Sequence, residues 1–268
     1  MNREPQRSPR HEIFIVGTGV SPAQDMTPRT TAILESVDQI VSIIRLPSER
    51  WLPAGARHKQ IHDLYALYSR ERHRLENYLE AAQRTIALAR LAPRTALVAP
   101  GSPSVYDRLA SLVLELGNTA ELETTIVPAV SSIESLLAFL GEDVAPGIQI
   151  YEARWFFENG VEPNTGAACL LFQPGAFTTD RMPTLADASP RKLQPLRDYL
   201  KKFYPGSQPL VFARCPQTLG DPGHLQQTVL DELCEGSEAD CQGTSLYIPS
   251  RSALDSERWR RHSAGREP

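Results

Sequence analysis

The first half of the chain alternates compact apolar runs with longer amphipathic stretches. This pattern predicts strands at residues 11–16, 38–44, 95–99 and 124–127, and helices at residues 27–40, 65–90, 105–116 and 131–140. Thr27 suits the N-cap of the first helix, with Pro28 at its first position, and Gly141 stands where the last helix should end. Strands that alternate with helices indicate a mostly parallel sheet covered on both faces. We therefore expect an α/β fold.

The pattern changes after Pro146. Strand-like runs follow at residues 147–151, 167–172, 210–213 and 245–248, and helices are expected at about residues 189–203 and 225–233. This second half indicates another α/β or an α+β lobe. The chain therefore divides into a disordered lead at residues 1–10, an N-terminal α/β domain at residues 11–145, a C-terminal α/β domain at residues 146–250 and a disordered tail at residues 251–268.

The composition is that of an ordinary soluble protein. The 268 residues carry a formal net charge of -4, with 41% hydrophobic and 22% charged residues, so the basic excess of a nucleic-acid binder is missing. The longest apolar runs fall far short of the roughly 20 residues that a membrane span requires, and residues 1–10 lack the apolar segment of a secretory signal. We expect a cytoplasmic protein that binds neither nucleic acid nor membrane.

The cysteines agree with a reducing compartment. Cys169, Cys215, Cys234 and Cys241 form no CxxC pair and have no histidine at metal-ligand spacing. They are expected to be reduced structural thiols, and no metal site is expected.

Three loops follow predicted strands at the sheet edge where ligands gather in parallel-sheet proteins. They are Gly17-Thr18-Gly19, Pro100-Gly101-Ser102-Pro103 and residues 128–132. Glycine lets a backbone approach a ligand closely, and Ser131 can cap its helix or bind a cofactor. Each loop alone is equally typical of a plain turn. The first loop lacks the third glycine of a dinucleotide fingerprint, and the chain has no GKS or GKT phosphate loop, so a nicotinamide or nucleoside triphosphate site is poorly supported.

Taken in order, these loops resemble a known family. The segments IFIVGTGVSPAQDMT, ALVAPGSPSVY, TTIVPAVSSIESLLAFLG and TSLYIPS match the succession of motifs in the tetrapyrrole methylase superfamily. The resemblance covers about residues 12–250. It implies two α/β lobes with S-adenosylmethionine bound between them, S-adenosylhomocysteine as the product, and usually a homodimer. It implies cofactor contacts at Gly17, Gly19, Pro100, Ser102, Val105, Tyr106, Ser131, Ser132, Gln173, Ala213, Thr244 and Ser245.

A narrower resemblance is to the borosin branch of that family, the peptide backbone α-N-methyltransferases. Residues 63–78 (DLYALYSRERHRLENY) and the stretch IYEARWFFENGVEPNTGAACLLFQPG carry it. In those enzymes a tyrosine, an arginine six residues later and a tyrosine four beyond line the reaction centre. Tyr68, Arg74 and Tyr78 have this spacing, so the resemblance implies that they are catalytic. Because residues 252–268 contain no apolar core peptide, the expected substrate is a separate ribosomal precursor peptide.

Backbone N-methylation would need such groups. An amide nitrogen is a poor nucleophile because its lone pair is delocalised into the carbonyl. A tyrosine near an arginine reaches the phenolate more easily and can act as a base, while the arginine or a second tyrosine can hold the charge that develops on oxygen. Helical spacing places Arg74 and Tyr78 on one face, with Tyr68 at the helix start or in the preceding loop.

Three other interpretations remain open. The tyrosines could be half-buried aromatics with surface hydroxyls, beside a solvated helix face on which arginines pair with Glu71 and Glu76. The substrate could be a small molecule such as a tetrapyrrole, whose carboxylates would suit a basic cleft of Arg70, Arg72 and Arg74. The chain could also bind cofactor or peptide without turnover, since residues 100–104 (PGSPS) replace the Tyr-Gly-His-Pro-Gly of borosin enzymes.

Overall fold

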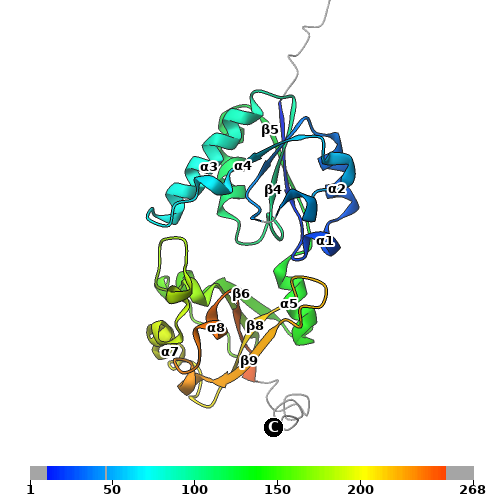
Figure 1. The fold of residues 1–268 in the computed structure, drawn as a ribbon. Coiled ribbons are helices and arrows are strands. Elements are labelled where there is room, and N and C mark those ends of the chain that lie inside the picture. The colour runs from blue at the N-terminus through cyan, green and yellow to red at the C-terminus, as the bar shows by residue number, and fades with distance from the viewer. Residues whose placement is uncertain (1–10, 46, 252–268) are drawn as a thin grey trace, which may run out of the picture. The chain divides into compact units, whose positions relative to one another are not determined.

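The computed structural model describes residues 11–45 and 47–251, so the segments predicted to be disordered lie almost entirely outside the described residues. The chain forms two compact units. Unit 1 extends to Ser135 and includes Gln217–Gly220, and unit 2 comprises Leu136–Pro216 and the residues from Asp221 onward. Each unit contains helices and its own sheet, as Figure 1 shows.

Unit 1 contains a five-stranded parallel sheet in the order β3-β2-β4-β1-β5. Its strands are β1 (Glu12–Gly17), β2 (Gln39–Ser42), β3 (Gln60–Asp63), β4 (Arg94–Ala99) and β5 (Glu123–Val127). Gly17 at the end of β1 pairs with Ala99 of β4, and Val16 pairs with Val127 of β5. Because these three parallel strands end at the same edge of the sheet, the loops that follow them lie close together.

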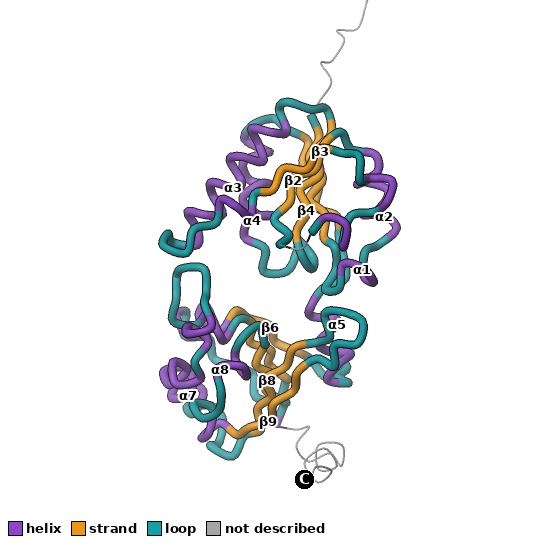
Figure 2. Tube along the Cα trace, viewed as in Figure 1, coloured by secondary structure: helices purple, strands orange, loops and turns teal. Residues whose placement is uncertain are grey.

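Helices cover both faces of this sheet (Figure 2). They are α1 (Pro22–Asp25), α2 (Pro28–Ser36), α3 (Arg74–Ala89) and α4 (Arg108–Thr119), while α5 (Ser132–Leu140) leads from unit 1 into unit 2. Ile13 and Ile15 of β1 are fully buried in a cluster with residues of α3 and α4. Val16 belongs instead to a second cluster that contains Leu34 of α2. Alternate side chains of β1 therefore fill two separate cores.

Two helix ends follow the predicted signals. The Thr27 side chain accepts a hydrogen bond from the Thr30 backbone N–H at 3.1 Å, and Pro28 is the first residue of α2. Gly141 follows α5 with a φ of 68°, and its N–H donates to the Ala138 carbonyl at 3.2 Å. Both predictions are confirmed.

The helix predicted from residue 65 begins later. α3 starts at Arg74, since the His73 side chain accepts from the Leu75 N–H at 3.2 Å and caps the helix. The residues before it form the edge strand β3 and one 3-10 turn, Tyr65–Leu67. Tyr68 therefore lies in the loop that leads into α3, as its spacing predicted.

Unit 2 contains a five-stranded mixed sheet in the order β6-β7-β10-β8-β9. Its strands are β6 (Ile148–Glu152), β7 (Ala168–Phe172), β8 (Pro209–Arg214), β9 (His224–Val229) and β10 (Ser245–Ile248), and its further helices are α6 (Ala153–Glu158), α7 (Gln194–Leu200) and α8 (Glu238–Cys241). β6 and β7 run parallel, whereas the other neighbours run antiparallel. The core of the unit gathers around Phe156, Leu171 and Phe212, all nearly or fully buried.

The helix predicted at residues 225–233 is wrong. β9 occupies His224–Val229, and only Leu230–Glu232 forms a 3-10 turn. β9 pairs with β8 along its whole length, from His224 opposite Arg214 to Val229 opposite Pro209. Pairing with β8 satisfies one side of its backbone, and such tertiary context outweighs weak local propensity.

Candidate functional site

The backbones of the first two loops of unit 1 are bonded to each other. Gly19 and Gly101 form an antiparallel bridge in which each N–H donates to the other residue's carbonyl, at 3.1 and 2.9 Å. Gly17 is packed so closely that a Cβ there would lie 2.1 Å from the Gly101 carbonyl oxygen and 2.9 Å from the Ala129 Cβ. Ala129 belongs to the third predicted loop. Gly17 therefore lies where all three loops meet, and only glycine fits there.

The loop after β4 combines a tight turn with open space. Ser102 is buried, and its carbonyl accepts from the Val105 N–H at 3.0 Å. Tyr106 has a φ of 52° and a 41% exposed side chain. A Cβ on Gly101, whose φ is 70°, would meet nothing within 4 Å. Together with the exposed Pro100, this loop leaves its backbone accessible to a ligand.

The third loop enters α5 through Ser131 and Ser132. The Ser131 hydroxyl donates to the Glu134 carboxylate at 3.2 Å, and the Ser131 N–H reaches the same oxygen at 3.3 Å. In return the Glu134 N–H donates to the Ser131 hydroxyl at 3.5 Å. Ser131 therefore caps the helix, one of the two roles that the sequence allowed. Ser132, the half-buried first residue of α5, is the more accessible of the two serines.

The four candidate cofactor residues of unit 2 lie at one end of its sheet. Ala213 of β8 pairs directly with Ser245 at the start of β10, and both are buried. Gln173 follows the last residue of β7 with a φ of 58°. Thr244 precedes Ser245, and its hydroxyl donates to the Asp240 carbonyl at 2.7 Å. Since β10 runs antiparallel to β7, the start of β10 lies beside the end of β7, and the four positions form one group.

The three residues predicted to be catalytic lie on α3 and in the loop before it. Arg74 is the first residue of α3, Tyr78 follows one turn later, and Tyr68 precedes the helix. The Tyr68 and Tyr78 rings meet edge to face with centroids 5.8 Å apart, and the Tyr65 ring lies 5.5 Å from that of Tyr68. The Arg45 guanidinium lies over the Tyr65 ring at 4.9 Å. The three aromatic rings thus form one tyrosine cluster, which consists of Tyr65, Tyr68 and Tyr78.

The Tyr68 hydroxyl is buried and has no hydrogen-bond partner in the part of the chain that the structure describes. For Tyr68, this observation contradicts the alternative in which the tyrosine hydroxyls lie at the surface. A buried hydroxyl without a partner costs about 1–3 kcal/mol. Such a group requires an explanation, and a bound acceptor would supply one.

Burial governs the acidity of the cluster. It raises the pKa of Tyr68, and the neighbouring Tyr78, Asp107 and Tyr65 act in the same direction. Burial also raises the pKa of Tyr78, although Arg74 lowers it, while Asp107 adds to the rise. Arg74 does favour the Tyr78 phenolate, as predicted, but burial outweighs the cation and the net pKa of Tyr78 is raised. Both tyrosines are neutral hydrogen-bond donors at neutral pH.

Asp107 is a residue of this site that sequence reasoning missed. It is the N-cap of α4, and its side chain accepts from the Ala110 N–H at 3.0 Å. Burial raises the pKa of its carboxyl group, whereas hydrogen bonds from the Ala110 and Leu109 backbones lower it. Asp107 directly follows Tyr106, so the loop of predicted cofactor residues ends at a carboxylate that acts on both tyrosines. An aspartate before an apolar helical repeat was the available signal.

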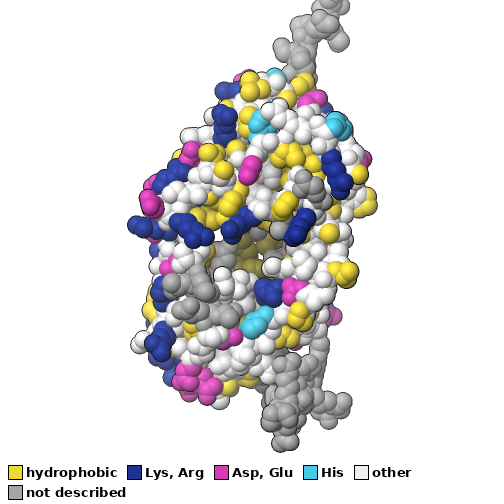
Figure 3. Space-filling view, in the orientation of Figure 1, with side chains coloured by type: hydrophobic (Ala, Val, Ile, Leu, Met, Phe, Trp, Pro, Cys, Tyr) yellow, Lys and Arg dark blue, Asp and Glu magenta, His cyan; other side chains and the backbone are white. Residues whose placement is uncertain are grey.

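Positive charge borders unit 1 near the tyrosine cluster. On the face that Figure 3 shows, Lys and Arg side chains line the margin of unit 1 at which α3 begins. Arg70 in the preceding loop is exposed, and Arg74 is half-buried. Basic side chains therefore lie beside the cluster, and the acidic Glu71 and Glu76 alternate with them along the chain.

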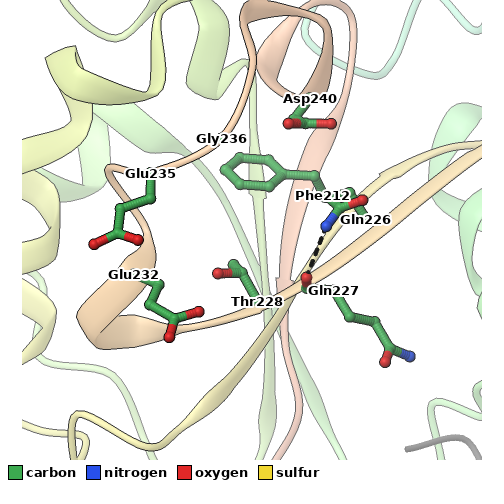
Figure 4. Close-up of a pocket in the computed structure, with 8 residues that line it drawn as sticks. All are labelled: Phe212, Gln226, Gln227, Thr228, Glu232, Glu235, Gly236 and Asp240. Carbon is green, nitrogen blue, oxygen red and sulfur yellow. Dashed lines mark hydrogen bonds between the residues drawn. The ribbon is translucent and has the colours of Figure 1, made fainter. Parts of the chain in front are cut away.

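A separate pocket lies beside β9 in unit 2. Its volume is about 170 Å³, and it is lined by Phe212, Gln226, Gln227, Thr228, Glu232, Glu235, Gly236 and Asp240 (Figure 4). None of the predicted site residues is among them. Its charged groups are carboxylates, which do not match the chemistry of the tyrosine cluster.

Residues 11–45 and 47–251 contain no helix that is both long and apolar enough to cross a membrane. No three His, Cys, Asp or Glu side chains in the same ranges gather into a metal site. Three of the four cysteines are buried, and burial raises the pKa of the Cys169 thiol to about 12.

The family model of the Tetrapyrrole (Corrin/Porphyrin) Methylases matches residues 12–214, which include the parallel sheet of unit 1, its three loops and the tyrosine cluster. The chain belongs to the tetrapyrrole methylase family. Its class is that of the S-adenosylmethionine-dependent methyltransferases. The close backbone packing at Gly17 and the open space at Gly101 fit a cofactor held by backbone atoms.

Similar curated proteins are fungal. One is the methyltransferase/ribosomally synthesized cyclic peptide lentinulin A precursor of Lentinula edodes. The chain is 25% identical to it over 200 residues, and the match covers 74% of this chain and 48% of that protein. It is 24% identical over 244 residues to the corresponding omphalotin A precursor of Omphalotus olearius, which covers 90% and 58%. The chain thus spans about half the length of these relatives.

Solved structures share the fold. The methyltransferase CobJ matches with a TM-score of 0.62 at 15% identity, over 89% of this chain and 94% of that one. Uroporphyrin-III C-methyltransferase from Thermus thermophilus, complexed with S-adenosylhomocysteine, matches with a TM-score of 0.57 at 18% identity, over 92% and 96%. These matches confirm the predicted α/β fold of the tetrapyrrole methylase type.

Proposed function

We propose that the protein methylates backbone amide nitrogens of a ribosomal precursor peptide, which it binds as a separate chain. The main support is the buried Tyr68 hydroxyl, which has no partner among the described residues and lies on a ring next to Tyr78, itself close to Arg74. A peptide carbonyl is an acceptor that would pair with this hydroxyl. The names of the fungal relatives join a methyltransferase to a cyclic peptide precursor, which supports the same class of substrate.

The candidate cofactor residues of both units would hold S-adenosylmethionine. In unit 1 the backbone of the Gly17 and Gly101 loops can approach the cofactor. Gly17 has no room for a side chain, and Gly101 opens onto free space. In unit 2 the proposed contacts are the grouped positions that include Gln173 and Ser245. When bound, the cofactor supplies an electrophilic methyl group.

Amide resonance determines what the catalytic residues must do. The nitrogen becomes nucleophilic only as its proton leaves and negative charge moves onto the carbonyl oxygen. Tyr68, a phenol whose pKa burial raises, donates a hydrogen bond from Oη to that oxygen and stabilises the charge. Tyr78 would act from its phenolate form, which Arg74 favours although burial and Asp107 keep the net pKa raised. The phenolate Oη would take the amide proton and become a neutral phenol.

A tetrapyrrole carbon is the second candidate substrate. The positive margin of unit 1, with the exposed Arg70, would suit its carboxylates. However, Arg72 of the predicted basic cleft forms an ion pair with Glu80 and donates to the Leu67 carbonyl at 2.7 Å. A carbon nucleophile also offers Tyr68 no amide carbonyl. We therefore favour the peptide.

The test is co-expression of the full chain with a small peptide encoded beside its gene, followed by intact and fragment mass spectrometry. We expect a ladder of masses one methylene apart, with each addition localised to a backbone nitrogen. Purified Tyr78→Phe should lose most of the ladder while S-adenosylhomocysteine binding, measured by calorimetry, stays intact. Arg74→Lys should be damaging as well, because lysine lacks the planar donor fork.

Tyr199→Phe is the matched control, since it removes a phenol hydroxyl that donates to the Val161 carbonyl within unit 2. It should leave the ladder unchanged. Wild-type ladders from Tyr78→Phe would remove Tyr78 from the mechanism. Absence of any ladder, with cofactor bound and a porphyrinogen methylated instead, would replace the peptide by a tetrapyrrole.

The active form is proposed to be a homodimer, as the resemblance to the family implies. Size-exclusion chromatography with light scattering tests this assignment. A monomer mass at the concentrations that support turnover would contradict it.

A further inference from the structure

Two side chains, Asn77 on α3 and Arg72 just before it, hold the loop that carries Tyr68. Asn77 is fully buried, its Nδ2 donates to the Ser69 carbonyl at 2.8 Å, and its Oδ1 accepts from the Ser69 N–H at 3.0 Å. Both backbone groups of the residue after Tyr68 are thus bonded to one side chain of the helix.

The residue before Tyr68 is held as well. Arg72 donates from Nη2 to the Leu67 carbonyl at 2.7 Å, and its Nη1 forms an ion pair with Glu80 on α3. The Tyr68 N–H itself donates to the Tyr65 carbonyl at 3.1 Å. The peptide groups on both sides of Tyr68 therefore have partners, while the buried Tyr68 hydroxyl has none among the described residues.

This contrast is informative because Arg74 and Tyr78 lie on α3, the helix that carries Asn77 and the Arg72 partner Glu80. Asn77 immediately precedes Tyr78, so the clamp ties Tyr68 to the element that carries the other two candidate catalytic residues. A flexible loop would let the hydroxyl turn toward solvent or backbone acceptors. With the flanking peptide groups held, the Tyr68 ring keeps its edge-to-face contact with the Tyr78 ring and its hydroxyl stays buried.

We propose that Asn77 and Arg72 are positioning residues that set the Tyr68 hydroxyl for the substrate carbonyl. This inference rests on the proposed function, in which Tyr68 stabilises charge on that oxygen. The clamp acts through Tyr68 and does not touch substrate. Misplacement of a catalytic group by about 1 Å can slow a reaction about 100-fold, so such a clamp should affect kcat more than binding.

The experiment compares Arg72→Met, Arg72→Lys and Asn77→Leu with the wild-type enzyme and with Gln83→Leu, a control at an exposed position of α3. Tyrosines labelled with ¹³C at Cζ are titrated by NMR, and the Tyr68 signal is assigned from its loss in Tyr68→Phe. Because burial is the first cause of the raised Tyr68 pKa, release of the loop should bring that pKa closer to its ordinary value.

Turnover on the methylated peptide is measured with the same samples. We expect Arg72→Met and Asn77→Leu to lower kcat by about 10-fold to 100-fold, with the dissociation constant for S-adenosylhomocysteine unchanged. Arg72→Lys keeps a cation for Glu80 but cannot reach both partners with a planar fork, so it should recover part of the rate. Gln83→Leu should match the wild type in both measurements.

The two readouts separate failure of the clamp from failure of the proposed function. An unchanged Tyr68 titration in both Arg72 variants would overturn the clamp, whatever the rates. If the clamp variants shift the Tyr68 titration but Tyr68→Phe keeps full turnover, the clamp positions a tyrosine that the reaction does not use. If Asn77→Leu does not fold, the Arg72 variants decide the question, since Arg72 lies at the surface.

Discussion

Alanine at Gly17 should damage fold and cofactor binding together. The added Cβ would lie 2.1 Å from the Gly101 carbonyl oxygen, 2.8 Å from Cδ of Pro103 and 2.9 Å from the Ala129 Cβ. Favourable contacts between such atoms lie at about 3.5 Å or more, so the Gly101 backbone must retreat by more than about 1 Å. That backbone is held by its bridge to Gly19, so relief of the clash breaks the bridge.

The magnitude follows from these contacts. Overpacking of a buried position costs about 1–3 kcal/mol. Loss of the two Gly19–Gly101 hydrogen bonds adds about 1 kcal/mol each. We therefore expect Gly17→Ala to lower the free energy of unfolding by about 3–5 kcal/mol, and to weaken S-adenosylhomocysteine binding because the loops no longer meet.

Urea unfolding and calorimetry with S-adenosylhomocysteine measure the two effects. Gly101→Ala and Gly220→Ala are matched probes, because each has a positive φ and open space at its Cβ. Both should cost about 1–2 kcal/mol in backbone strain. Only Gly101→Ala should weaken cofactor binding. A Gly17→Ala protein with the wild-type urea midpoint and affinity would refute the reasoning.

Three further outcomes are expected. Asp107→Asn keeps an N-cap residue but removes a charge that raises the pKa of Tyr68 and Tyr78. Both pKa values should therefore fall in a spectrophotometric titration, and unchanged values would show that Asp107 does not act on these tyrosines. Because burial raises the folded-state pKa of Tyr68 above the ordinary 10.0, stability should be constant below about pH 10 and fall as the pH rises further. Urea midpoints should show Tyr68→Phe with a smaller alkaline loss than wild type, and equal losses would count against this linkage. Phe156→Ala should lower the free energy of unfolding in urea by about 3–5 kcal/mol, because the ring is fully buried. Leu219→Ala, at an 88% exposed position, should change it by no more than about 0.5 kcal/mol, and similar losses in the two variants would argue against the described core.

The parallel sheet was predictable because its signal is local and repeated. Runs such as residues 11–16 must be buried on both faces, and the structure places Ile13 and Ile15 in one core and Val16 in another. The Thr27-Pro28 start of α2 and the Gly141 stop of α5 rest on backbone chemistry within a few residues. No knowledge of distant neighbours was needed for them.

The edge strands were harder to predict. The segment of β9 was predicted as a helix, and Leu225, Val229 and Leu233 recur at a helical spacing of four residues. Its strand form depends on pairing with β8. β3 is likewise an edge strand, defined by its pairing with β2. The helix predicted from residue 65 is shortened by the 3-10 turn Tyr65–Leu67 and the loop that follows it. These elements are stabilised by partners that a reading along the chain does not place beside them.

The candidate site divides in the same way. Arg74 and Tyr78 share a helix, so their proximity follows from spacing alone. Asp107 reaches the tyrosines only because the loop after β4 ends where α3 begins, and its effect on both hydroxyls could not be read from sequence. The sign of the acidity shift was missed for the same reason, since burial is a property of the fold.

Burial has two opposing consequences for the proposed chemistry. It keeps Tyr68 protonated, and in surroundings of low polarity a hydrogen bond to developing negative charge is stronger than in water. The same burial makes ionisation of Tyr78 costly, with Arg74 favouring the phenolate and Asp107 opposing it. Protonation of Asp107, whose pKa burial also raises, would remove that opposition. The tyrosines and Asp107 should therefore titrate as one coupled system, and the pH dependence of methyl transfer should report their joint protonation.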